Sequence, residues 1–471
     1  MELKTASKMF CRCPNNSLQK APNENVCPIC LGHPGTMPTV NKEAIRAIFR
    51  LGMALGGEIP EKSQFDRKSY FYPDLPKGYQ ISQYEHPFVK GGALTGIKLR
   101  RIHLEEDAGK LIHSDSGETL CDYNRAGVPL MELVTEPDIK TGEEAVRFTK
   151  ELQLALRYLG ISSADMEKGE MRLEANISVR PEGTDELGTK VEVKNLNSFS
   201  FMAKAIDYEI ERQIEALESG KKIIQETRGW DSKKNKTFSQ RSKEEAHDYR
   251  YLPEPDLPPY DLTDKLFIDL DELRSSIPEM PWEKRKRFAE EFGISESAIA
   301  VFAEARELAE YYEETVSEIT AEDITNEDKK KALQITANYI IADVKGMMNR
   351  ENLDVNMFRE KVSAENMADL CILIIKGELS SRMAKDILVE MYETGLDPRD
   401  VIAKKGISQV TDEEVIKTAI KEVLANNEKA VEDYKKGKEN ALQFLFGKTM
   451  TALKGQGNPE AIRKALEEEV K

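Results

Sequence analysis

The sequence predicts an α+β fold in which an N-terminal antiparallel sheet domain is followed by all-α regions. Before about residue 270, short runs of alternating apolar and polar residues are punctuated by glycine and proline, as in strands joined by turns. After it, apolar residues recur every three or four positions, as in ESAIAVFAEARELAEYYEETV and KKALQITANYIIADVKGMM, which indicates helices. We therefore expect domains at residues 1–270, 271–395 and 396–471, with Gly395 ending a helix.

Four cysteines lie in the N-terminal segment CRCPNNSLQKAPNENVCPIC, as the pairs Cys11-x-Cys13 and Cys27-x-x-Cys30. Thiols at such short spacings predict a tetrahedral Zn²⁺ site. Four sulfur ligands would leave no open position for a substrate, so the zinc would be structural. Two disulfides, or four unrelated thiols, are the alternative, and the lack of a recognisable secretion signal disfavours disulfides.

Residues 66–84 read DRKSYFYPDLPKGYQISQY and interleave basic with aromatic side chains. Cations such as Arg67 and Lys68 would neutralise phosphate oxygens, and rings such as Tyr70 would stack on a base or a ribose. The prolines limit how far the segment can collapse when it is empty. The segment therefore predicts a site for phosphate and bases, with a tyrosine-rich strand pair carrying solvated lysines as the alternative.

An acidic run follows the strand-like segment GIKLRRIHL. Glu105, Glu106 and Asp107 stand together after His103 and before Gly109. At least one carboxylate at a strand end would project toward a cleft, where its hard oxygen atoms would suit Mg²⁺. A solvated helix face is the usual explanation of such a run and remains the alternative.

Two further segments, MRLEANISVR and TKVEVKNLNSF, alternate apolar and polar residues with a period of two. Alternation places Glu174 and Asn176 on one face of the first strand, and Glu192 and Lys194 on one face of the second. These faces could simply be the wet side of an antiparallel sheet. Beside an acidic turn, however, they favour a floor that holds metal ions and phosphate.

Composition excludes several classes of protein. No apolar run approaches the about 20 residues needed to cross a bilayer, and cysteines arranged for metal in a chain without a recognisable signal peptide suit the reducing cytoplasm. The net charge of −16 argues against a broad nucleic-acid interface, and we expect no DNA partner. The segment GTDELGTK has Thr and Lys transposed relative to a Walker phosphate loop, so no such loop predicts ATP binding.

Six segments in register make the chain recognisable: DRKSYFYPDLPKGYQISQ, IHLEEDAGK, DYNRAGVPLMELVTEPDI, EANISVRPEG, VEVKNLNSF and DYRYLPEPDLPP. They closely resemble the GatB component of the tRNA-dependent amidotransferase, and the resemblance continues into GKENALQFLFGKTMTALKGQGNP near the end. It implies a sheet domain similar to the glutamine synthetase and guanidino kinase fold. It also implies a YqeY-like tRNA-binding tail at residues 396–471.

The resemblance implies an ATP-dependent carbon–nitrogen ligase that corrects mischarged Asp-tRNA(Asn), Glu-tRNA(Gln) or both. Such an enzyme uses ATP and Mg²⁺ to phosphorylate the side-chain carboxylate, and ammonia then displaces the phosphate. The sequence shows no amidase signature. Ammonia would therefore come from the glutaminase A subunit, held to this chain by the small C subunit in a heterotrimer.

The family's site can be carried onto matching residues of this chain. Four of them would take part in the chemistry: Lys68, Glu106, Glu174 and Glu192. The three glutamates would bind Mg²⁺ directly or through water, and Lys68 would hold phosphate or the substrate carboxylate. Four neighbours would contact the nucleotide: Arg67, Tyr70, Asn176 and Lys194.

One departure from the family concerns the metal site. The family opens with a strand that carries a Glu-x-His pair just before the segment that here reads ELKTASKMFC, and this sequence starts at Met1-Glu2-Leu3-Lys4. We expect that the start site was placed too far downstream. If the pair is truly lacking, the alternative is a non-catalytic tRNA-binding zinc scaffold.

Overall fold

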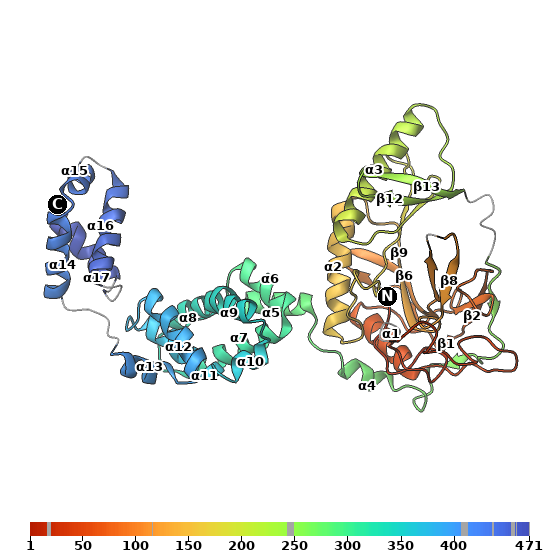
Figure 1. Cartoon of the computed structure of the whole chain (residues 1–471), viewed down its shortest axis with the longest axis horizontal. Coiled ribbons are helices and arrows are strands. Elements are labelled where there is room, and N and C mark those ends of the chain that lie inside the picture. The colour runs from red at the N-terminus through yellow and green to blue at the C-terminus, as the bar shows by residue number, and fades with distance from the viewer. Residues whose placement is uncertain are drawn as a thin grey trace. The chain divides into compact units, whose positions relative to one another are not determined.

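The computed structural model describes residues 1–16, 20–114, 116–242, 249–406, 413–435, 438–453, 457 and 459–470. The chain divides into two compact units, Met1–Met280 and Pro281–Lys471 (Figure 1). The first unit mixes strands with helices, and the second is helical. This confirms the predicted α+β class with its sheet region ahead of its helical region.

The first unit contains many short strands. They are β1 (Lys62–Ser63), β2 (Asp66–Ser69), β3 (Tyr79–Ser82), β4 (Val89–Lys90), β5 (Ala93–Leu94), β6 (Ile97–Glu106), β7 (Lys110–His113), β8 (Thr119–Asp122), β9 (Pro129–Thr135), β10 (Ala175–Ile177), β11 (Val191–Lys194), β12 (Glu226–Asp231), β13 (Lys236–Ser242), β14 (Leu252–Pro253) and β15 (Tyr260–Asp261). Its helices are α1 (Lys42–Ala54), α2 (Gly142–Tyr158), α3 (Phe199–Glu218) and α4 (Leu270–Ser275). The strands predicted in MRLEANISVR and TKVEVKNLNSF form, but only their central residues pair, as β10 and β11.

The strands are arranged in several small sheets. Their orders are β14-β2-β3, β4-β6-β5 with β9 also beside β6, β10-β11-β12-β13, β1-β15 and β7-β8. Among the described residues, neighbouring strands are antiparallel except for β11 and β12, which are parallel. Helix α3 lies between these two strands in the chain and supplies the crossover that a parallel pair requires. The predicted antiparallel arrangement therefore fails at this one pair.

Strand β6 carries the acidic run and determines where it lies. Its first half alternates between buried and exposed residues, and its second half, from Ile102 to Glu106, is buried on both faces. Strand β9 pairs with it from Leu99 to Glu106. The charged residues at the end of β6 are therefore enclosed by protein, which excludes a solvated acidic face for this segment.

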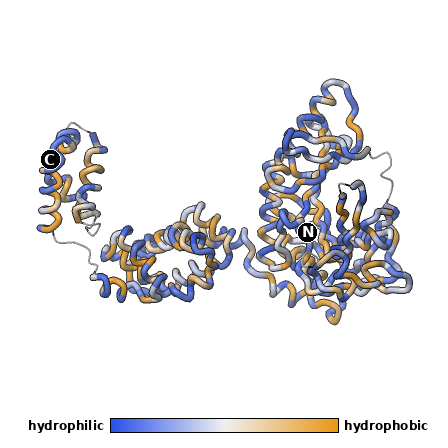
Figure 2. Tube along the Cα trace, in the orientation of Figure 1, coloured by the Kyte–Doolittle hydropathy of each residue, from blue (hydrophilic) through white to orange (hydrophobic). Residues whose placement is uncertain are grey.

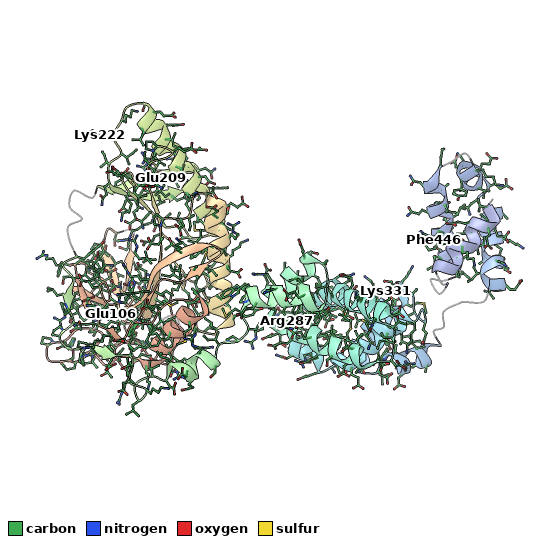
Figure 3. All side chains as sticks on the ribbon, turned by 180° about the vertical axis from the view of Figure 1, so that it is seen from behind. Glu106, Glu209, Lys222, Arg287, Lys331 and Phe446 are labelled. Atoms are coloured by element: carbon green, nitrogen blue, oxygen red, sulfur yellow. The ribbon has the colours of Figure 1, made fainter. Side chains whose placement is uncertain are left out.

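Helices α2 and α3 pack together over the sheet that contains β10 and β11. The core between them includes Ile177, Val193, Met202 and Trp230. A Cβ atom added to Gly142 would lie 2.5 Å from the Ala203 carbonyl oxygen, so glycine permits this close helix contact. The buried carboxylate of Glu209 accepts hydrogen bonds from Arg212 Nε and Thr237 Oγ1, both at 2.9 Å, which fixes α3 against β13 (Figure 3).

The second unit consists of helices over its described residues. They are α5 (Pro281–Glu291), α6 (Glu296–Glu304), α7 (Arg306–Ala321), α8 (Asn326–Tyr339), the π-helix η3 (Ile340–Val344), α9 (Lys345–Glu351), α10 (Val355–Arg359), α11 (Ala364–Ile375), α12 (Ser381–Thr394), α13 (Pro398–Lys405), α14 (Glu413–Ala425), α15 (Glu428–Lys435), α16 (Glu439–Ala452) and α17 (Pro459–Val470). Helix α12 ends at Gly395, whose φ of 72° is left-handed, as predicted.

Two apolar cores fill this unit. One includes Phe288, Tyr311 and Phe358 and lies among α5 to α13, and the other includes Ile420, Leu445 and Leu466 and lies among α14 to α17. Hydrophobic and hydrophilic residues alternate along these helices (Figure 2). Within the described ranges, the structure contains no helix with the length and apolar character needed to span a membrane.

Candidate functional site

Three candidate metal ligands, which we call the His–Glu–Glu group, lie where β6 and β9 pair. His103 and Glu105 share a face of β6 because they are two residues apart, and Glu132 stands opposite His103 on β9. His103 Nε2 is 3.8 Å from Glu105 Oε2 and 3.9 Å from Glu132 Oε2. The His103 and Glu105 side chains are buried, whereas that of Glu132 is 46% exposed. The group is therefore open to solvent at Glu132.

Glu105 is an anion at neutral pH despite its burial. Burial opposes its ionisation, but interactions with His103, Lys68 and Ser82 outweigh that effect and lower the pKa of Glu105 to about 2. Ser82 Oγ donates a hydrogen bond to Glu105 Oε2 at 3.1 Å. An ionised carboxylate offers the hard oxygen atoms that Mg²⁺ prefers.

Lys68 and Tyr70 are neighbours of this group. The ammonium of Lys68, on β2, lies 4.8 Å from the centre of the Tyr249 ring and 6.0 Å from that of Tyr70. The rings of Tyr70 and Tyr249 meet edge to face, with centres 5.6 Å apart. Burial, followed by the charges of nearby acidic groups including Glu105, raises the pKa of Tyr70, so its hydroxyl stays protonated at neutral pH.

Strands β10 and β11 bring four predicted residues together in what we call the Lys194 cluster. Asn176 stands opposite Glu192 in the strand register. Lys194 Nζ is 3.2 Å from Glu174 Oε1 and 3.7 Å from Glu192 Oε1. Burial opposes the charge of Lys194, but the two carboxylates outweigh it and raise the pKa of the ammonium. The four residues share one face of the strand pair, as their alternation predicts, while Glu174 and Glu192 are not members of the His–Glu–Glu group.

Tyr249 and Tyr251 connect the two groups. Lys68 lies over the Tyr249 ring, and Tyr249 also contributes to the raised pKa of Lys194. Tyr251 is stacked on Tyr84 with ring centres 4.5 Å apart, and Glu105 and Glu132 act on its pKa after burial. Both groups therefore approach the segment DYRYLPEPDLPP, which the sequence marks only as a family motif.

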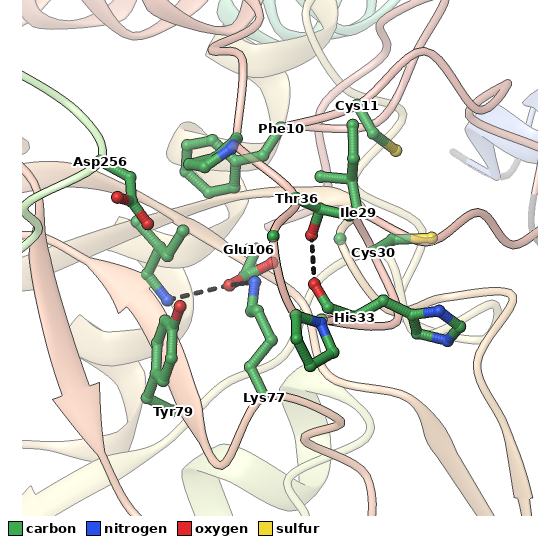
Figure 4. A pocket seen from close by; sticks show the side chains of 16 residues that line it. Phe10, Cys11, Ile29, Cys30, His33, Thr36, Lys77, Tyr79, Glu106 and Asp256 are labelled. Carbon is green, nitrogen blue, oxygen red and sulfur yellow. Dashed lines mark hydrogen bonds and ion pairs between the residues drawn. The ribbon is translucent and has the colours of Figure 1, made fainter.

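The acidic run after His103 is divided among different environments. Glu106 points away from Glu105 because adjacent strand residues face opposite sides. It forms an ion pair with Lys77, accepts a hydrogen bond from Ile81 N at 3.0 Å, and lines a cavity of about 220 Å³ (Figure 4). Asp107 instead pairs with Arg172. The structure does not bring Glu106 together with Glu174 or Glu192, so these contacts do not support its predicted Mg²⁺ role.

Arg67, predicted to contact the nucleotide, is engaged by protein groups. Its guanidinium forms two hydrogen bonds with the Glu254 carboxylate, at 2.8 and 2.9 Å, and a third with Asp256 at 3.1 Å. It also lies over the Tyr79 ring, 4.4 Å from the ring centre. These contacts join β2 to the proline-rich segment, and a phosphate would have to displace them.

The four predicted zinc ligands lie together. The sulfur atoms of Cys11, Cys13, Cys27 and Cys30 are within 4.8 Å of one another, and none of these cysteines forms a disulfide. The Cys27 and Cys30 sulfurs are 3.8 Å apart, which matches the edge of about 3.8 Å expected for a tetrahedron with Zn–S bonds of about 2.3 Å. A hydrogen bond from Cys11 is the largest cause that lowers the pKa of Cys30 to about 5. The geometry therefore fits a metal ion held by four thiolates.

None of the three residues in the His–Glu–Glu group is among the site residues predicted from the sequence. His103 and Glu105 belong to the acidic run, but the resemblance points only to Glu106 within it. Glu132 lies in the segment PLMELVT, whose alternation indicates a strand but not its partner. The pairing of β6 with β9, which places Glu132 opposite His103, is a tertiary contact.

Comparison with known proteins agrees with this architecture. Residues 1–268 match the family described as the GatB/GatE catalytic domain, and residues 310–470 match the family described as the GatB domain. The sheet unit with its carboxylates is thus the catalytic domain of an amidotransferase.

Similar proteins are known from three bacteria, and each is named as the B subunit of an aspartyl/glutamyl-tRNA(Asn/Gln) amidotransferase. Those of Dehalococcoides mccartyi, Carboxydothermus hydrogenoformans and Persephonella marina are 45%, 44% and 43% identical to this chain. The alignments cover 99%, 100% and 100% of this chain and 97%, 97% and 98% of those relatives. The chain belongs to the GatB family of aspartyl/glutamyl-tRNA(Asn/Gln) amidotransferases, which confirms the resemblance noted in its sequence.

Proposed function

We propose that this protein uses ATP to phosphorylate the side-chain carboxylate of mischarged Asp-tRNA(Asn), Glu-tRNA(Gln) or both, after which ammonia replaces the phosphate. The observation that carries the proposal is the His–Glu–Glu group with Lys68 beside it. A carboxylate resists attack by ammonia because its oxygen is a poor leaving group, whereas an acyl phosphate departs readily. The catalyst must mainly position the reactants and neutralise charge.

Glu105 and Glu132 fit Mg²⁺ as ligands, because one is a buried anion and the other leaves the group open to solvent. When bound, Mg²⁺ would neutralise charge on the phosphate oxygens. Arg101 Nε donates a hydrogen bond to His103 Nδ1 at 3.3 Å, which directs the other ring nitrogen of His103 toward the two carboxylates. His103 would therefore orient Glu105 and Glu132.

In this proposal Glu105 takes the place that the sequence suggested for Glu106, because Glu105 alone faces His103. Lys68 would hold a phosphate or the substrate carboxylate, since its ammonium is already positioned over Tyr249 and near Glu105. Glu174 and Glu192 keep their proposed metal-binding role. Asn176 and Lys194 would then contact the nucleotide, with Lys194 exchanging a carboxylate partner for a phosphate oxygen.

The remaining features of the assembly are also proposals. We assign residues 1–270 to a cradle similar to glutamine synthetase and guanidino kinases, residues 271–395 to a helical domain, and residues 396–471 to a tRNA-binding tail. The glutaminase A subunit would supply ammonia, and the small C subunit would complete the heterotrimer. The four cysteines would hold a structural Zn²⁺, since all four positions are filled by sulfur.

The proposal is tested by measuring nucleotide and amide together. The chain, combined with its partner subunits and supplied with glutamine, ATP and mischarged tRNA, should form ADP in step with Gln-tRNA(Gln) or Asn-tRNA(Asn). Amide synthesis without ADP formation would contradict it. A non-catalytic scaffold would bind tRNA and zinc but show no tRNA-stimulated ATP hydrolysis.

Lys68→Met should lower the tRNA-stimulated ATP hydrolysis rate about 100-fold or more, because it removes one preorganised positive charge. Lys90→Met is a suitable control, since Lys90 is an exposed lysine of the same unit. Steady-state assays of the assembled complex would measure both variants, and tRNA affinity should change little. Equal rates for the two variants would exclude Lys68 from the site.

A further inference from the structure

Lys8 is fully buried beside the four cysteines, with 0% of its surface exposed. Its ammonium donates a hydrogen bond to the Asn25 carbonyl oxygen at 2.8 Å and lies 3.5 Å from the Tyr123 carbonyl oxygen. The Cys30 sulfur is 3.9 Å from the same nitrogen. Across the ranges that the structure describes, no carboxylate oxygen lies within ion-pair distance of Lys8.

A buried ammonium normally requires a negative partner, because removing it from water without one costs several kcal/mol. Lys284, the other buried lysine of the described residues, has such a partner in Glu313 at 2.8 Å. Around Lys8, two backbone carbonyls supply only partial negative charge. The remaining neighbour is Cys30, so the negative charge must come from sulfur.

We propose that Lys8 is the countercharge of a four-thiolate metal centre formed by Cys11, Cys13, Cys27 and Cys30, and that it determines how tightly the metal is retained. A divalent ion bound by four thiolates leaves two negative charges on the centre. These charges are poorly solvated, because Cys11 and Cys30 are only 6% and 5% exposed. The Lys8 ammonium compensates one of them through its contact with the Cys30 sulfur.

This inference rests on the proposed zinc site and adds a residue outside its ligand set. It explains why a lysine is buried where no carboxylate receives it. It also explains how a centre with excess negative charge is tolerated inside the sheet unit. Groups that hydrogen-bond to metal ligands commonly control metal affinity.

The test compares Lys8→Met with Lys284→Met. Both substitutions remove a buried ammonium and keep an apolar side chain, but only the first removes the partner of a sulfur ligand. Zinc transfer to the chromophoric chelator 4-(2-pyridylazo)resorcinol should be about 10- to 100-fold faster from Lys8→Met than from the wild type. Release from Lys284→Met should match the wild type even if that variant is less stable. Unchanged release from Lys8→Met would overturn the inference.

If Lys8→Met does not fold, lysine acylation of the wild-type chain decides the matter. Lys8 should resist acetic anhydride in the zinc-loaded protein and become acetylated after zinc is removed, whereas Lys284 should stay protected in both states. Equal labelling of Lys8 in the two states would overturn the inference. A wild-type protein that binds no zinc would overturn the metal site as well, which separates the two failures.

Discussion

Glu105→Gln is expected to lower tRNA-stimulated ATP hydrolysis about 100-fold or more, because it removes the buried negative charge of the His–Glu–Glu group. The amide has nearly the shape of the carboxylate, and the Ser82 hydroxyl, which donates to Glu105 at 3.1 Å, can donate equally to an amide oxygen. The fold and the affinity for tRNA should therefore change little. ATP hydrolysis with and without mischarged tRNA, together with filter binding of tRNA, would measure the effect.

Glu106→Gln is the matched control, because it makes the same chemical change on the opposite face of the same strand. It should retain ATP hydrolysis but unfold more easily, by about 3 kcal/mol, since it leaves Lys77 without its charged partner in a site where the two side chains are 12% and 5% exposed. Denaturant unfolding would measure this loss. If Glu106→Gln abolished hydrolysis while Glu105→Gln remained active, Glu106 would be the ligand, as the sequence predicts.

The double substitution of Cys11 and Cys13 by serine is expected to remove zinc completely and to lower the free energy of unfolding by more than about 4 kcal/mol. The physical reason is that metal binding orders a segment with few apolar side chains of its own. Elemental analysis and denaturant unfolding would measure the two effects. The ATP hydrolysis rate of the fraction that still folds should fall less than its stability, because the four thiolates leave no position for substrate.

Cys121→Ser provides the control for this experiment, since Cys121 is a half-buried free cysteine outside the metal site. It should keep its zinc and most of its stability. A double mutant with normal zinc content would refute the assignment of four sulfur ligands.

Several parts of the fold and the site depend on local pattern and could be predicted. The period of two placed Glu174 and Lys194 on the same sides of their strands, and the register of β10 with β11 joined them. Closely spaced cysteines indicated a metal site because the ligands lie near one another in the chain. Likewise, Gly395 could be predicted to end a helix, because glycine adopts left-handed φ without a steric penalty.

Other parts depended on contacts between distant segments. Alternation shows that Glu105 and Glu106 face opposite sides, but it does not say which side faces His103's partners until β9 is paired with β6. The engagement of Arg67 by Glu254 joins segments far apart in sequence. The parallel pairing of β11 with β12 depends on where α3 packs.

The sequence by itself determined the residue types that this protein brings to its chemistry: carboxylates for a hard cation, lysines for phosphate, and four thiols for a soft one. Short-range periodicity determined which neighbours share a face. Only the tertiary structure decided which carboxylate of the acidic run meets His103 and Glu132, and that Lys8 is buried against sulfur. The reason is physical: the pairing of β6 with β9 and the burial of each charge are set by segments distant in the chain.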